Sequence, residues 1–147
     1  MKTATIDNIL SWKPCSDYTE EIITELFAGR ETLTVQDILE LNISAKDKLW
    51  AILREDMLDA AILHEFACRC AEEALKLIDN PDPRSIAAIA TKRAWLRGEI
   101  TDAELSVAWT AARSAADAIW ADAAYATYAA ARDKQIEIIK EILKEIM

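Results

Sequence analysis

Hydrophobic and polar positions in the last third of the chain follow the pattern of one long helix. Between Asp102 and Met147 there is no Gly and no Pro, and from Ala103 to Ala131 about every second residue is Ala. Ala is the strongest helix former, and a helix with small side chains on most faces allows a second helix to approach closely. The pattern therefore predicts a long Ala-rich C-terminal helix.

An unbroken helix from Asp102 to Lys144 would be about 65 Å long at its rise per residue, which is longer than a compact domain of this size is wide. We therefore expect this helix to bend near residues 121–124 or near Asp133, or to extend into a partner.

Helix-capping signals divide the rest of the chain into shorter helices. Residues that favour a helix start are followed by acidic neighbours, and Gly or Pro marks the expected ends. We expect helices over residues 17–29, 34–41, 44–78 and 82–98, and from Thr101 onward. The hydrophobic content of 52% excludes general disorder. The sequence therefore predicts an all-α single domain, residues 1–147, with about five helices and no sheet.

Three polar residues fall within the apolar stripes of two of these helices. Asp56 and His64 interrupt a stripe that repeats at helical spacing from Leu49 to Ile78, and Arg93 projects from the stripe of the helix after Pro83. An unpaired charge inside a core costs several kcal/mol, so each residue needs a partner. We predict that Asp56 and Arg93 are largely buried in one hydrogen-bonded network with or near His64. This network either fixes how the helices meet or forms a ligand or catalytic pocket.

The charge balance is acidic, and one helix departs from it. The net charge of -9 argues against binding nucleic acid through overall attraction and suits a basic protein partner. The candidate partner-binding residues are the solvent-facing acids Glu55, Glu65, Glu72 and Glu73. The helix after Pro83 is basic, and its candidate anion-binding residues are Arg84, Lys92 and Trp95, together with Arg93. The alternative is that its cations pair with those four acids.

The cysteines and the motifs give little evidence for catalysis. Cys68 and Cys70 lie two apart on a predicted helix, so their side chains diverge, and we expect them and Cys15 to be reduced thiols in a cytoplasm. His64 and Cys68 could supply two metal ligands, but a buried histidine beside a free thiol explains them better. We find no nucleophile motif and no Gly-rich phosphate loop, and we expect no cofactor and no metal.

Aromatic residues in the Ala-rich segment suggest an oligomer interface. Trp109 and Trp120 are eleven residues apart, so they lie on nearly the same face of a helix, and Tyr125 and Tyr128 are neighbours at a spacing of three. We predict a homodimer through these four residues. Neither a signal peptide nor an apolar run of the roughly 20 residues that a membrane span needs is present.

Five segments in order carry a family resemblance: residues 47–55 (DKLWAILRE), 66–71 (FACRCA), 80–85 (NPDPRS) and 98–101 (GEIT), followed by the Ala tract. Over about residues 34–143 the chain resembles small, Ala-rich helical proteins of phage and prophage genomes that are labelled immunity proteins. The resemblance implies a cytoplasmic, non-enzymatic protein that binds something, such as an inhibitor or a phage-encoded accessory or counter-defence factor acting in the host cytoplasm.

Two other functions remain open at this point. One is a protein that binds or sequesters a small anionic ligand with the basic helix. The other is an enzyme that uses Asp56 and His64.

Overall fold

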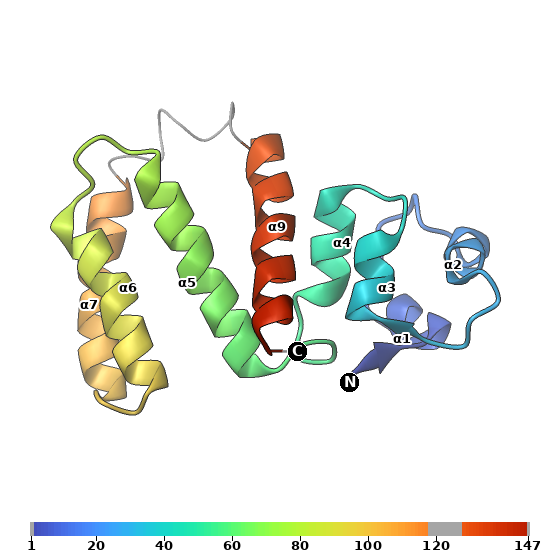
Figure 1. Cartoon of the computed structure of the whole chain (residues 1–147), viewed down its shortest axis with the longest axis horizontal. Coiled ribbons are helices and arrows are strands. Elements are labelled where there is room, and N and C mark those ends of the chain that lie inside the picture. The colour runs from blue at the N-terminus through green and yellow to red at the C-terminus, as the bar shows by residue number, and fades with distance from the viewer. Residues whose placement is uncertain (1, 118–127, 147) are drawn as a thin grey trace. The chain divides into compact units, whose positions relative to one another are not determined.

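The computed structural model describes residues 2–117 and 128–146 and is built almost entirely of helices (Figure 1). The described residues contain eight helices and one two-stranded ladder. The predicted all-α class is confirmed, but the described residues form more helices than the five expected and a small ladder where no sheet was expected. By its contacts the chain divides into two units, residues 1–63 and residues 64–147, which we describe separately. The assignment of the whole chain to one domain stays a prediction.

Unit 1 combines short helices with the ladder. Its elements are β1 (Thr3–Ala4), α1 (Ile6–Ser11), α2 (Glu20–Phe27), β2 (Leu33–Thr34), α3 (Val35–Glu40) and α4 (Ala45–Ile52). The strands are antiparallel, with Thr3 opposite Thr34 and Ala4 opposite Leu33. Large apolar side chains from four of these elements form a core in which the following are almost completely buried: Phe27, Leu33, Ile38, Leu39, Leu49 and Ile52.

Local capping explains where these helices begin. The Thr34 side chain caps α3, and Ser44 caps α4, as the sequence predicts. The expected cap at Asp17 is wrong, because the hydroxyl of Thr19 accepts the hydrogen bond from the Ile22 amide at 3.3 Å and α2 begins after it. Helix α2 then ends at Phe27, and the two residues after it, Ala28 with φ +51° and Gly29 with φ +81°, are both in the left-handed region.

The predicted long helix over residues 44–78 is wrong. The structure has two helices there, α4 and α5 (Ala60–Lys76), separated by residues 53–59. The Arg54 guanidinium ends α4 by donating to the carbonyl oxygens of Ala51 at 3.1 Å and Trp50 at 2.8 Å, which satisfies acceptors that the helix leaves open. Consecutive side chains diverge on a helix, whereas this loop buries both Met57 and Leu58.

Unit 2 contains most of α5, then α6 (Pro83–Leu96), α7 (Asp102–Asp117) and α9 (Tyr128–Ile146). The signals for α6 and α7 are confirmed: Asp82 caps α6, and the Thr101 hydroxyl accepts a hydrogen bond from the Glu104 amide at 3.2 Å. Helix α6 ends before Gly98, whose φ is +74°. The helices α6 and α7 pack closely as a hairpin, as a helix rich in Ala allows (Figure 1).

Burial along α5 corrects the phase of the stripe predicted from Leu49 to Ile78. Helical spacing along that stripe places Ala60 and Ala67 inside, but the structure exposes both and buries Phe66 and Cys68. The prediction treated residues 44–78 as one helix and so continued the helical spacing of α4 through residues 53–59. Because those residues are not helical, the spacing that holds along α4 does not continue into α5. Helix α9 runs through Asp133 and buries one face, formed by Ile136, Ile138, Ile139, Ile142 and Leu143. The expected bend near residues 121–124 lies outside the described residues.

Candidate functional site

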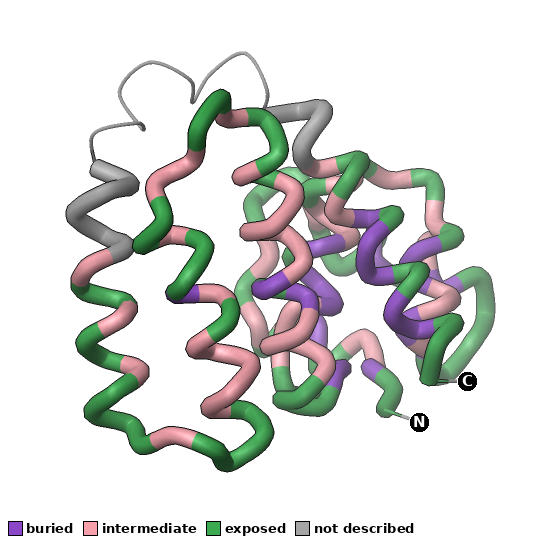
Figure 2. The backbone as a smooth tube through the Cα atoms, turned by 60° about the vertical axis from the view of Figure 1, so that its left-hand side comes forward, coloured by how far each residue is buried: buried purple, intermediate pink, exposed green. Residues whose placement is uncertain are grey.

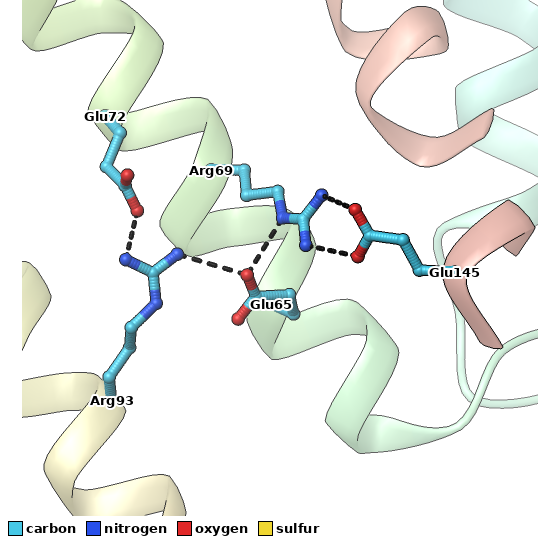
Figure 3. Close-up of polar contacts among 5 residues, drawn as sticks. All are labelled: Glu65, Arg69, Glu72, Arg93 and Glu145. Atoms are coloured by element: carbon cyan, nitrogen blue, oxygen red, sulfur yellow. Dashed lines mark hydrogen bonds and ion pairs between the residues drawn. The ribbon is translucent and has the colours of Figure 1, made fainter. Parts of the chain in front are cut away.

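A chain of ion pairs joins three helices of unit 2 (Figure 3). Arg93 of α6 reaches between two acids of α5, pairing with Glu72 and donating to Glu65 Oε1 at 3.1 Å. The same oxygen of Glu65 accepts from Arg69 Nε at 2.9 Å. Arg69 then donates two hydrogen bonds to Glu145 of α9, at 3.1 and 2.6 Å. Glu65 and Arg69 lie four residues apart on α5, the spacing at which an acid and a base pair along one helix.

The electrostatics within this chain of ion pairs favour the charged forms of its acidic side chains. Partial burial pushes the pKa of Glu65 upward, but the hydrogen bonds from Arg69 and Arg93 outweigh that effect and hold its pKa below the usual value. Hydrogen bonds from Arg69 also lower the pKa of Glu145. The side chain of Arg93 is 31% exposed, so it lies at the edge of the packing and not in a closed core. This arrangement fits a structural network better than a catalytic pocket.

The predicted buried network of Asp56, His64 and Arg93 is wrong, because Arg93 is 31% exposed and pairs with Glu65 and Glu72 instead. Asp56 is exposed, in the loop after α4, because no helix passes through that position. His64 is half-buried, and its ring packs edge-on against Trp95 with 5.6 Å between the centroids. Asp56 belongs to unit 1 and His64 to unit 2, so the structure describes no site that combines them.

Three of the four acids proposed to bind a partner take part in ion pairs within unit 2. Glu65 and Glu72 belong to the ion-pair chain, and Glu73 pairs with Lys76 at 2.8 Å. Glu55 is exposed in the loop of unit 1. Basic side chains of α5 and α6 therefore engage three of these acids, and the role of the four in binding a partner stays a prediction.

The groups proposed to bind an anion are likewise engaged within the chain. Arg84 donates two hydrogen bonds to Asp82, at 3.1 and 2.8 Å, which lower the pKa of Asp82 to about 2. Lys92 lies over the ring of Trp109, 5.4 Å from its centroid. The indole of Trp95 donates to Asp102 at 2.7 Å. The structure thus favours internal pairing over a preformed anion site.

The hairpin of α6 and α7 leaves large apolar side chains uncovered. Figure 2 shows that both helices are mostly exposed or half-buried, and among the described residues of α6 only Ala88 is buried. The exposed fractions are 51% for Ile86, 38% for Leu96, 72% for Val107 and 48% for Trp109. Of the four aromatic residues predicted to form a dimer interface, Trp109 is described. Trp120, Tyr125 and the side chain of Tyr128 lie outside the described part.

Unit 1 holds a cavity of about 140 Å³ that the sequence did not reveal. Its buried wall consists of apolar side chains from α1, α2, β2, α3 and α4, and its lining includes Tyr18 and Asp47. The Tyr18 hydroxyl donates to Asp47 Oδ2 at 2.6 Å, and burial together with this bond raises the pKa of Tyr18. In the sequence Asp47 has only the spacing of a capping partner for Ser44, so its second role was hidden.

The thiols are unpaired, as predicted. Cys15 is exposed, Cys70 is half-buried and Cys68 is buried, and burial raises the pKa of Cys68. Among the residues that the structure describes, no three His, Cys, Asp or Glu side chains come together in a group that could hold a metal ion. None of the described helices has both the length and the apolar character needed to cross a membrane.

Comparisons of the chain with protein-family models, with curated proteins and with solved structures found no match.

Proposed function

We propose that the chain is a non-enzymatic binding protein, an inhibitor of the immunity-protein kind, that acts by covering a surface of another protein. The observation that carries this proposal is the uncovered apolar surface of the α6–α7 hairpin, with Val107 72% and Trp109 48% exposed. These exposed apolar side chains all lie on one hairpin, and Trp is enriched among the residues that dominate binding energy at protein interfaces. The resemblance to immunity proteins supports the same function.

The partner we propose has an apolar contact area on an otherwise basic surface. The net charge of the chain is -9, and complementary charge mainly speeds association. The binding energy then comes from the apolar side chains of the hairpin. In this proposal the net charge of the chain speeds association and the apolar side chains hold the partner. The four acids no longer carry the binding, since two of them are engaged in the ion-pair chain.

Affinity capture with matched variants tests this function. The tagged protein, its Val107→Asp variant and its Leu77→Asp variant are each used to capture proteins from lysate of the source cells. Leu77 is 77% exposed but follows α5 and lies outside the hairpin, so it is a control of the same chemistry. We expect a partner in near-equimolar amount with the wild type and with Leu77→Asp, and its loss with Val107→Asp.

Two results would contradict the proposal. One is equal capture of the partner by both variants, and the other is capture of no partner in near-equimolar amount. Thermal melts serve as the folding control, since a charge at either exposed site should change stability by no more than about 0.5 kcal/mol.

We also propose a homodimer through the Ala-rich part of the chain, with Trp109 as its described contact residue. Light scattering on the purified protein should give twice the monomer mass of 16.4 kDa. The Trp109→Ala variant should return the mass to that of the monomer. A monomeric wild type at micromolar concentration would rule out this assembly.

A further inference from the structure

We infer that the cavity of unit 1 is a binding site for a small, uncharged aromatic molecule that carries one N–H or O–H donor. The cavity measures about 140 Å³. An apolar cavity of about 150 Å³ in an engineered protein binds benzene, so this space is large enough for one small aromatic molecule. Its buried wall is aliphatic and aromatic, formed by Ile23, Phe27, Leu33 and Ile38, each at most 3% exposed.

The part of the lining that reaches the surface is held in place before any ligand arrives. Trp50 lines the cavity and is 38% exposed. The Arg54 guanidinium lies 4.7 Å from the centroid of the Trp50 ring and 4.0 Å from that of Trp12, so the cation stacks on both rings. The carbonyl hydrogen bonds of Arg54 fix the guanidinium in turn. A wall fixed in this way reduces the entropy that binding would otherwise cost.

The polar end of the cavity determines which ring fits. Asp47 Oδ2 accepts hydrogen bonds from the Tyr18 hydroxyl at 2.6 Å and the Ser44 hydroxyl at 2.8 Å. Within the described part of the chain, Asp47 Oδ1 accepts no hydrogen bond, so a ligand donor can use it. Lys46 lines the cavity as well, so the lining carries one negative and one positive side chain and offers no net charge to an ionic ligand. We therefore assign the site to a neutral aromatic molecule with one donor, which is the chemistry of indole or phenol.

Calorimetric titration of the full chain with indole tests this inference, and benzothiophene serves as an isosteric probe that lacks the N–H donor. We expect saturable indole binding with a Kd on the order of 100 µM, and about tenfold weaker binding of benzothiophene. In Asp47→Asn the loss of the charge should reduce that preference to about threefold. Absence of saturable indole binding at about ten times that concentration, or equal affinity for both probes, would overturn the inference.

Cavity-filling variants locate the site. Ala51 lines the cavity and is 7% exposed, so Ala51→Leu should fill the space and weaken indole binding at least about tenfold. Ala45→Leu, on the same helix but outside the lining, is the matched control and should bind like the wild type. Leu26→Phe fills the cavity from α2 and provides the same test if Ala51→Leu does not fold. Unchanged binding in a folded cavity-filling variant would refute the assignment.

Chemical protection gives an independent readout. Cys15 is exposed and lines the cavity. Saturating indole should slow the alkylation of Cys15 severalfold without changing the reaction of the other two thiols. Alkylation of Cys15 at the same rate with and without bound indole would place the ligand elsewhere and overturn the inference.

Discussion

Replacement of Arg93 measures how strongly the ion-pair chain holds unit 2 together. Its side chain is 31% exposed, and its partners Glu65 and Glu72 are 31% and 41% exposed. Pairs at such positions contribute about 0.5–1 kcal/mol each, well below the 3–5 kcal/mol that a fully buried pair costs when broken. With the lost packing of the aliphatic stem, Arg93→Ala should lower the free energy of unfolding by about 1–2 kcal/mol.

Comparison with Arg93→Met separates packing from charge. Met keeps most of the stem, so its loss should be smaller than that of Ala by about 0.5–1 kcal/mol. The control is Arg84→Ala on the same helix, whose pair with Asp82 is exposed, and we expect a change below about 0.5 kcal/mol. Urea unfolding followed by circular dichroism gives the values, and hydrogen exchange of amides in α5 and α6 shows whether unit 2 opens by itself.

The pH dependence provides a second check on the same variants. Hydrogen bonds from the arginines hold the pKa of Glu65 below its ordinary value of 4.5. This stabilisation is complete above the ordinary pKa and is lost as the pH falls through the lower pKa of the folded state. The cost of Arg93→Ala should therefore be full near pH 7 and should shrink near pH 3. A cost above about 3 kcal/mol, equal losses for Ala and Met, or no change with pH would refute the reasoning.

Three further predictions follow from contacts in both units. Arg54→Ala should lower the free energy of unfolding by about 1–2 kcal/mol, measured by urea titration, because it removes a helix cap and two cation–π contacts. Exposed Cys15 should react with a thiol reagent at neutral pH, whereas burial raises the pKa of Cys70 to about 11 and should slow its reaction about a hundredfold. Because burial and Asp47 raise the pKa of Tyr18 above its ordinary 10, spectrophotometric titration should show a late tyrosine that Asp47→Asn shifts downward. The hydrogen bond from Tyr18 stabilises the folded state below pH 10, and this stabilisation is lost as the pH rises through the pKa that Tyr18 has in the folded protein.

Several helix starts were predictable because their causes are local. Ser44, Asp82 and Thr101 each cap a helix with a side chain that bonds an amide two or three residues ahead. The end of α4 was not predictable from the same rules. The segment after α4 contains no Gly or Pro. The helix ends because the Arg54 side chain folds back onto two carbonyl oxygens, and the sequence does not show which position a long side chain takes.

Site residues were predictable only where sequence neighbours determine them. The pair of Glu65 and Arg69 follows from their spacing on one helix. The extension of that pair to Arg93 and Glu145 depends on how three helices pack, and the cavity depends on five elements of unit 1. Both arise from long-range contacts, so neither leaves a periodic signal in the chain.

The short ladder of β1 and β2 has a consequence for folding kinetics. It pairs Thr3 with Thr34, so forming it closes a loop of about thirty residues, at an entropic cost of about 3 kcal/mol. The hairpin of α6 and α7 instead joins two helices through residues 97–101 alone, and contacts between such near neighbours form in microseconds. The hairpin should therefore assemble first, and closing the loop should limit the rate at which unit 1 reaches its native packing.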